Sequence, residues 1–263
     1  SMFEGAGIAV HSYPYYSAEG GVRFAEMLDT LSKLPERSVV LLHACCHNPT
    51  GVDLTRAQWD ELIPVLLKRG LIPYLDLAYQ GFGDGIAEDA YAVRALAAAG
   101  ASFLVANSFS KSMSVYGERA GALSVVCPDA KQAEHVLGQM KFIIRRIYSS
   151  PAIHGGQIVA HVLADADLRP MWEAELAAMR QRILAMRKSL HSVISAKVPG
   201  RNFDYFLAQH GMFSYTGLSA VQVDRLRDEY AVYLVRSGRI CVAGLNSGNV
   251  ERTAQAMAEV MAG

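Results

Sequence analysis

Three polar side chains stand at or near the ends of three successive apolar segments of the chain. Asn48 follows the first segment, Asp76 lies inside the second, and Ser108 follows the third. If these segments are neighbouring strands of an open α/β sheet, a ligand would bind where their carboxyl ends meet. We therefore predict that the three side chains share one site, because their coincidence is more informative than any one of them alone.

Asp76 is the least easily explained of the three, since Leu75 and Leu77 flank it in an apolar segment. A carboxylate buried without a partner costs free energy. We therefore expect a cationic or hydrogen-bonding partner close to it. From the residues alone, a structural salt bridge and a functional role are equally open.

A lysine and an arginine follow the third segment. Lys111 comes three residues after Ser108, and Arg119 comes eight residues after the lysine. A hydroxyl and a guanidinium both suit a phosphate group. A lysine in a confined site can lose its proton and attack a carbonyl carbon. By itself the Ser-x-x-Lys spacing is a weak signal, because it recurs by chance on many protein surfaces.

The elements that must position these residues alternate between strands and helices. The run 39–42 is continuously apolar and predicts a strand buried on both faces. Thr55 and Gln58 form a capping box that begins a helix, and Gly70 ends it. The same pattern then repeats, with strands predicted at 71–79, 102–107 and 120–127 and helices at 88–99 and 129–147. This alternation predicts an α/β fold with a mostly parallel sheet.

The C-terminal part of the chain has a different pattern. An apolar stripe at alternating spacings of four and three predicts one long helix, with the residues Trp172, Leu176, Met179, Ile183, Met186, Leu190 and Val193. We expect this stripe to pack within its own domain, although a coiled-coil seam has the same spacing. Beyond it, strands are predicted at 212–215, 232–235 and 239–242 and helices at 219–230 and 249–261. We predict a large domain over 1–175 and a smaller α+β domain over 176–263.

Composition excludes several classes of function. The chain has 263 residues, and its 25 basic and 25 acidic side chains cancel, so neither nucleic acid nor an anionic membrane is an expected partner. The charge-free run 147–164 contains proline, glycine and histidine, which argues against a membrane helix. The first residues lack the pattern of a signal peptide, and four cysteines are too few for a disulfide framework. We expect a cytoplasmic protein without a metal site.

Several motifs together resemble the pyridoxal-phosphate-dependent class I aminotransferases of the aspartate and aromatic amino-acid branch. They are CCHNPTG at 45–51, DLAYQGF at 76–82, NSFSK at 107–111, YGER at 116–119 and SGRICVAG at 237–244. The segments RNFDY at 201–205 and GMFSYTGLS at 211–219 are most similar to the bacterial aromatic-amino-acid (tyrosine) aminotransferases. The resemblance implies the fold type I architecture, with a large α/β domain and a small α+β domain joined by a long helix.

The resemblance also implies roles for the residues around the cofactor, pyridoxal 5'-phosphate. Lys111 matches the lysine that forms the internal aldimine and later moves the substrate proton. Asp76 matches the carboxylate that keeps the pyridinium nitrogen protonated. Asn48 and Tyr79 match the two donors to the phenolic oxygen, which lower the pKa of the imine. Asn48 is expected to contact substrate as well.

Four further residues match groups that bind anionic parts of the ligands. Ser108 and Arg119 match ligands of the cofactor phosphate. Arg239 matches the arginine that grips the substrate α-carboxylate with two prongs. Arg145 matches an arginine that reaches into the partner subunit's site and binds a side-chain carboxylate.

Other interpretations remain open for some of these positions. Arg145 stands beside Arg146 on a predicted helix, and such an arginine is usually a solvated charge. Tyr148 and Phe213 are candidates for the pocket wall, but the sequence favours a buried core aromatic as the role of each.

The implied activity is transamination of tyrosine and phenylalanine, together with aspartate and glutamate, by a homodimer that uses 2-oxoglutarate as amino acceptor. Chains of this family begin well before the first residue here, and their N-terminal portion carries part of the phosphate-binding site. An aspartate-specific enzyme, a noncatalytic remnant and another fold type I reaction are the alternatives. The retained side chains favour the aminotransferase.

Overall fold

The computed structural model describes residues 2–17 and 20–262 of the chain. Its main sheet has the order β1-β2-β3-β4, which is also the order of the strands in the sequence. The first three strands are parallel and the fourth is antiparallel to its neighbour, with the strands β1 (Val39–His43), β2 (Ile72–Leu77), β3 (Phe103–Ser108) and β4 (Gly121–Val126). The prediction of an α/β fold with a mostly parallel sheet is confirmed.

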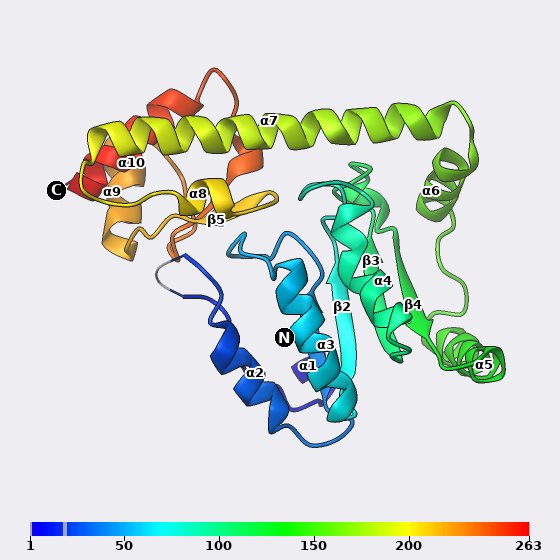
Figure 1. The fold of residues 1–263 in the computed structure, drawn as a ribbon. Coiled ribbons are helices and arrows are strands. Elements are labelled where there is room, and N and C mark those ends of the chain that lie inside the picture. Colours follow the sequence, from blue (N-terminus) through cyan, green and yellow to red (C-terminus); the bar gives the residue numbers. More distant parts are fainter. Residues whose placement is uncertain (1, 18–19, 263) are drawn as a thin grey trace.

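The helices between the parallel strands begin and end where the sequence predicts. Thr55 caps α3 (Arg56–Lys68) through a capping box with Gln58, and Gly70 follows its last turn in the left-handed conformation. Between β2 and β3 the chain forms a short 3-10 turn, η1 (Glu88–Ala90), and then α4 (Tyr91–Ala98). Helix α3 packs against α4 on one side and α2 (Phe24–Ser32) on the other (Figure 1). A single turn, α1 (Met2–Gly5), precedes them.

The prediction that the first strand is buried on both faces is wrong. In β1, Val40 and Leu42 are buried, whereas Val39 is 58% and Leu41 38% exposed. The reason is that the described residues cover only in part the face of the sheet that carries Val39 and Leu41. A continuous apolar run shows that a strand can be buried on both faces, but not that the chain covers both.

After β4 the chain forms two helices that pack much less closely. Helix α5 (Ala130–Ile147) begins at Asp129, whose side chain accepts a hydrogen bond from the Gln132 backbone, and it has no buried residue. Helix α6 (His154–Ala164) was not predicted, because its glycines and histidines obscure the periodic pattern. Among the residues that the structure describes, no helix combines the length and apolar character needed to cross a membrane.

A 30-residue helix, α7 (Leu168–Lys197), joins the main sheet to the C-terminal elements (Figure 1). Its predicted apolar stripe is buried or half-buried, mainly against α10 (Val250–Ala262) and α8 (Tyr205–Ala208), which argues against a coiled-coil seam. The C-terminal strands pair antiparallel as β5 (Phe213–Tyr215) and β6 (Arg239–Cys241), with α9 (Ala220–Tyr230) between them. Short 3-10 turns, η2 (Tyr116–Glu118) and η3 (Val242–Gly244), complete the order.

The strand predicted at 232–235 does not form. Ala231 adopts the left-handed conformation that ends α9, and the Val232 backbone N–H donates to Leu226 of that helix. Val235 makes only an isolated bridge to Arg239, and a turn closes between Val235 and Gly238. This segment therefore forms a helix end and a turn. Its β-branched residues favour a strand, so the sequence pattern did not predict this structure. The domain division at 175 and 176 stays a prediction.

Candidate active site

The carboxyl ends of the three parallel strands lead directly into the predicted site residues. His43, the last residue of β1, is level with Asp76 on β2, and Asp76 is level with Ala106 on β3. Each strand then passes into a loop. The loop after β1 contains Asn48, the one after β2 contains Tyr79, and the one after β3 contains Lys111. The sheet therefore brings together residues from three separate motifs.

Five side chains form a connected group, which we call the Tyr79 cluster: Asn48, Tyr79, Lys111, Phe213 and Arg239. The Asn48 amide Nδ2 donates to the Tyr79 hydroxyl at 3.3 Å, and Lys111 Nζ lies 4.8 Å from the centroid of the Tyr79 ring. Arg239 Nη1 donates to Asn48 Oδ1 at 3.0 Å. The Phe213 ring meets Tyr79 edge-on at 5.9 Å and lies 4.6 Å from the Arg239 guanidinium carbon. An amine, a phenol, an amide and a guanidinium thus meet in one place.

The Tyr79 hydroxyl has competing influences on its acidity. Burial raises the pKa of Tyr79, and the charge of Asp76 raises it further. The hydrogen bond from Asn48 and the charge of Arg239 act in the opposite direction, because both stabilise a phenolate. The net pKa is raised, so Tyr79 is a neutral hydrogen-bond donor at neutral pH.

Asp76 is half-buried, and no group within residues 2–17 and 20–262 donates a hydrogen bond to its carboxylate. The described residues therefore do not supply the partner that the sequence predicts for Asp76, and that expectation stays a prediction. Across from it, the His43 Nδ1 atom is buried without a hydrogen-bond partner. Burial lowers the pKa of His43, while the charge of Asp76 opposes that shift. A carboxylate in this setting is free to pair with a cationic group that the chain itself does not provide.

The two residues predicted to bind the cofactor phosphate, Ser108 and Arg119, hydrogen-bond to groups close to them in the sequence. The half-buried Ser108 Oγ accepts a hydrogen bond from the Ser110 backbone N–H at 3.3 Å. Arg119 is exposed, adopts the left-handed conformation with φ of 54°, and donates to the Tyr116 carbonyl at 2.9 Å. Neither side chain hydrogen-bonds to the Tyr79 cluster within the described residues, so their role as phosphate ligands stays a prediction.

A comparison with known protein families accounts for both the fold and the Tyr79 cluster. The family model for aminotransferase class I and II matches residues 1–257. The chain belongs to this family.

Named relatives support the same assignment for this aminotransferase-family chain. It is 61% identical to the aromatic-amino-acid aminotransferase of Escherichia coli and 50% identical to an aspartate aminotransferase of Pseudomonas aeruginosa, covering 99% of this chain and 66% of each relative. A solved aromatic-amino-acid aminotransferase from Burkholderia pseudomallei, covalently bound to pyridoxal phosphate, superposes with a TM-score of 0.97 at 52% identity, over 98% of this chain and 65% of that one. The aminotransferase-family chain therefore spans just under two thirds of these relatives.

Arg145 makes no hydrogen bond to the Tyr79 cluster within the described residues of this aminotransferase-family chain. It is exposed in the last turn of α5, where it donates to the Ser149 hydroxyl. Tyr148, which ends the helix, is 53% exposed and so is not a core aromatic. Phe213, in contrast, belongs to the cluster. Within one copy of the chain, only Phe213 of these three contributes to the site.

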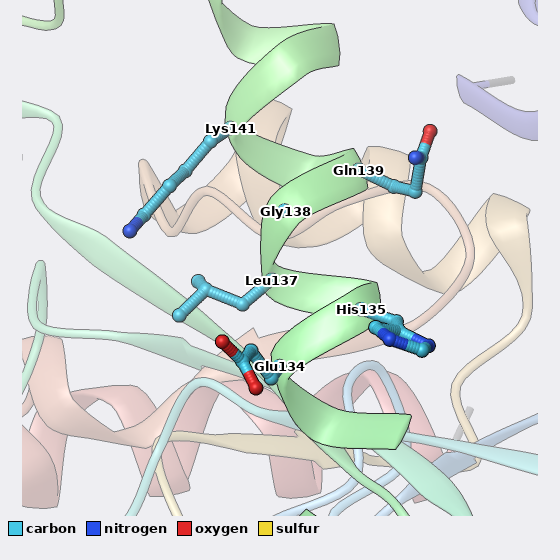
Figure 2. Close-up of a pocket in the computed structure, with 6 residues that line it drawn as sticks. All are labelled: Glu134, His135, Leu137, Gly138, Gln139 and Lys141. Atoms are coloured by element: carbon cyan, nitrogen blue, oxygen red, sulfur yellow. The ribbon is translucent and has the colours of Figure 1, made fainter. Parts of the chain in front are cut away.

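A hollow beside α5 is also separate from the cluster. Figure 2 shows that its side chains leave the helix in different directions and do not converge on one point. None of the predicted site residues lines it, since the lining consists of Glu134, His135, Leu137, Gly138, Gln139 and Lys141.

One group of potential metal ligands lies next to the loop that carries Asn48, but its carboxylate already accepts hydrogen bonds from the backbone. Cys45, Cys46 and Asp89 bring their ligand atoms within 4.8 Å of one another. The Asp89 carboxylate accepts hydrogen bonds from four backbone N–H groups, those of Gly81, Gly83, Asp84 and Gly85. Asp89 therefore holds the turn that follows Tyr79, and we assign the group this structural role.

Sequence analysis missed two residues beside the site, Asp53 and His210. The Asp53 carboxylate accepts hydrogen bonds from the backbone N–H groups of Cys46 and His47, directly before Asn48. His210 Nδ1 lies 3.6 Å from the same carboxylate. The available signal was an acidic residue closing the loop that begins at Cys45, which is typical of a side chain that binds loop backbone.

His47 makes the folded chain sensitive to acid. Burial and the neighbouring charge of His43 lower the pKa of His47 from 6.5 to about 4. The unfolded chain therefore binds a proton first as the pH falls, so stability present above pH 6.5 is lost between about pH 6.5 and 4. The loss is at most about 3 kcal/mol of the free energy of unfolding.

The variant His47→Asn retains a polar atom that can bond to the Thr50 hydroxyl, which His47 Nδ1 contacts at 2.8 Å. We expect its free energy of unfolding, measured with urea at pH 7 and pH 4.5, to fall less between the two values than that of the wild type. Equal falls in both proteins would show that His47 does not titrate on unfolding.

Proposed function

We propose that this protein is a pyridoxal-phosphate-dependent aminotransferase. Its substrates would be aromatic amino acids, tyrosine and phenylalanine, together with aspartate and glutamate, and 2-oxoglutarate would accept the amino group. The observation that carries the proposal is the Tyr79 cluster beside Asp76, whose carboxylate accepts no hydrogen bond from the described residues. The identities to aromatic-amino-acid and aspartate aminotransferases support both substrate classes.

The donor set of the site fits the cofactor. Pyridoxal phosphate presents an aldehyde carbon, a phenolic oxygen and a ring nitrogen, and the chain offers a complementary group for each. Lys111 supplies the amine, Asn48 and Tyr79 supply two hydrogen-bond donors, and the Asp76 carboxylate accepts no hydrogen bond from the described residues. When bound, the cofactor would supply an electron sink for a carbanion at the substrate Cα.

Lys111 and Asp76 would act on protons. Lys111 Nζ lies against the face of the Tyr79 ring, and from there its amine would take the proton from the substrate Cα and return it. Asp76 would hold a proton on the ring nitrogen, since an ionised carboxylate in a half-buried site favours a positive partner.

Asn48, Tyr79 and Arg239 would orient the ligands. Asn48 uses its Nδ2 atom toward Tyr79 and its Oδ1 atom toward Arg239, so one amide joins the cofactor donors to the substrate-binding arginine. The Arg239 guanidinium would grip the substrate α-carboxylate with two parallel hydrogen bonds. Phe213 lies beneath that guanidinium and keeps its plane in place. Ser108 and Arg119 would bind the cofactor phosphate.

Arg145 would complete the site from a second copy of the chain, which makes the proposed enzyme a homodimer. Its exposed position, and its hydrogen bond to Ser149 rather than to any member of the Tyr79 cluster, support this arrangement. Four free cysteines, two of them buried side by side, support a reducing compartment such as the cytoplasm. We retain the division into domains at 1–175 and 176–263 as part of the proposal.

The decisive test is the residue to which the cofactor binds covalently. The purified protein is loaded with pyridoxal phosphate, reduced with borohydride, digested and mapped by mass spectrometry. We expect the reduced cofactor mass on Lys111, because Lys111 is the lysine that lies against Tyr79. Lys131, on the exposed first turn of α5, is the matched internal control and should carry none. Cofactor mass on another lysine, or on none, would refute the assignment and favour a noncatalytic remnant.

A further inference from the structure

The loop that carries Asn48 is held by hydrogen bonds from its backbone to a single carboxylate, that of Asp53. Asp53 Oδ2 accepts a hydrogen bond from the Cys46 backbone N–H at 2.6 Å, and Oδ1 accepts one from the His47 N–H at 2.7 Å. The Asp53 side chain is only 15% exposed. Because both oxygens are used on two consecutive N–H groups, the carboxylate fixes the direction in which the chain enters Asn48.

The backbone at this point needs such support. Cys46 adopts the left-handed conformation, with φ of 52°, which residues other than glycine rarely adopt. A backbone in this conformation persists where its surroundings determine it. The two hydrogen bonds to Asp53 start at this residue and at the next one, so they act where the chain would otherwise relax.

The same carboxylate also faces the C-terminal part of the chain. His210 Nδ1 lies 3.6 Å from Asp53 Oδ2, and the His210 backbone N–H donates to the Gly51 carbonyl at 2.7 Å. Gly51 itself has a φ of 75°, and a Cβ there would lie 2.5 Å from the Phe213 carbonyl oxygen. The loop 46–53 and the segment 210–213 are therefore packed directly on each other.

A buried arginine fixes the C-terminal side of this junction. Arg187 on α7 is 1% exposed, and its Nη2 atom donates to the carbonyls of Gly211 and Phe213, each at 2.8 Å. Asp53 therefore lies between two segments that each deliver one member of the Tyr79 cluster: Asn48 from the loop and Phe213 from the segment that Arg187 holds.

We propose that Asp53 is a positioning residue of the site, which acts through the backbone of Cys46 and His47 to aim the Asn48 side chain at Tyr79 and at the cofactor. This inference rests on the proposed function. Asp53 touches neither substrate nor cofactor in this assignment, and its effect is transmitted by the loop. The neutral amide of Asp53→Asn can accept only one of the two hydrogen bonds and sets an N–H donor against the other.

The experiment compares Asp53→Asn with Asp84→Asn, first in the protein without cofactor and then in the protein loaded with pyridoxal phosphate. Asp84 is a suitable control, because its exposed carboxylate also faces His210, at 4.0 Å, but binds neither N–H group. Hydrogen exchange is measured first, in the protein without cofactor. We expect exchange at Cys46 and His47 to become at least tenfold faster in Asp53→Asn, while exchange in β1 and throughout Asp84→Asn stays as in the wild type.

The second measurement is the pH titration of the visible absorbance of the bound cofactor. We expect its midpoint to rise in Asp53→Asn, because a displaced Asn48 no longer stabilises the phenolic oxygen. Asn48→Ala should raise the midpoint by a similar amount, and the double variant by no more than Asn48→Ala alone. Asp53→Ser, which keeps one acceptor oxygen, gives a second reading if Asp53→Asn does not fold.

The outcomes separate this inference from the proposed function. Unchanged exchange at Cys46 and His47, or faster exchange without a shift of the midpoint, would overturn the role of Asp53 alone. Additive shifts in the double variant would likewise show that Asp53 does not act through Asn48. A wild-type protein that shows no cofactor absorbance would overturn the proposed function and, with it, this inference.

Discussion

Asp76→Asn is expected to lower kcat for transamination by at least about a thousandfold, which corresponds to about 4 kcal/mol of transition-state stabilisation. The neutral amide cannot hold a proton on the ring nitrogen, so the carbanion formed at the substrate Cα loses its electron sink. No other group of the described chain hydrogen-bonds to the Asp76 carboxylate, and His43 across from it has its pKa lowered by burial. Nothing nearby can therefore replace the lost charge.

Binding of the cofactor should suffer much less than turnover. Ser108 and Arg119 would still bind the phosphate, and Lys111 keeps its place against Tyr79. The measurements are kcat with tyrosine and with aspartate, together with the Kd of the cofactor. Asp228→Asn makes the same chemical change at an exposed residue of α9 and is the control. Near-normal turnover by Asp76→Asn, or a loss of binding as large as the loss of turnover, would remove Asp76 from its proposed role.

Arg145→Leu is expected to lower kcat/KM for aspartate and glutamate by about a thousandfold and to leave the values for tyrosine and phenylalanine within about tenfold. Arg239 would bind the α-carboxylate of every substrate, whereas Arg145 would pair only with a side-chain carboxylate. An arginine left desolvated beside an aromatic ring would be unfavourable, so it must move aside for that substrate. The exposed position of Arg145 and its bond to the exposed Ser149 allow this movement.

A mixing experiment tests whether Arg145 acts from the second copy. Arg145→Leu and Lys111→Ala are each prepared, and the two proteins are unfolded and refolded together. In a hybrid dimer, Lys111 of one copy would meet the partner's Arg145, so one site is intact and activity with aspartate should return. Arg146→Leu is the control, because Arg146 lies over Phe142 on the same helix. If mixing restores nothing, Arg145 does not complete the site across the dimer. An equal fall for tyrosine and aspartate would mean that it supports the fold.

The sequence by itself determined the strands and helices of the main sheet up to β4 and the order in which they deliver the site residues. The capping box of Thr55 and Gln58 is local in the chain, and so is the run of apolar residues that makes each strand. The order of the apolar segments was enough to place Asn48 and Asp76 at the same end of the sheet, because parallel strands align their carboxyl ends. Motif resemblance extended this to Tyr79, Lys111 and Arg239, which the structure brings into one cluster.

Only the tertiary structure decided how these residues touch one another and what surrounds them. Arg239 reaches Asn48 across 191 positions, and no local pattern encodes that distance. The same holds for Asp53, because only the folded loop shows that its carboxylate binds the backbone N–H groups of Cys46 and His47. The exposure of Val39 and Leu41 in β1 was also decided by which parts of the chain cover that face of the sheet. Periodicity reports which face of an element is apolar, whereas the contacts of that face depend on parts of the chain that are distant in sequence.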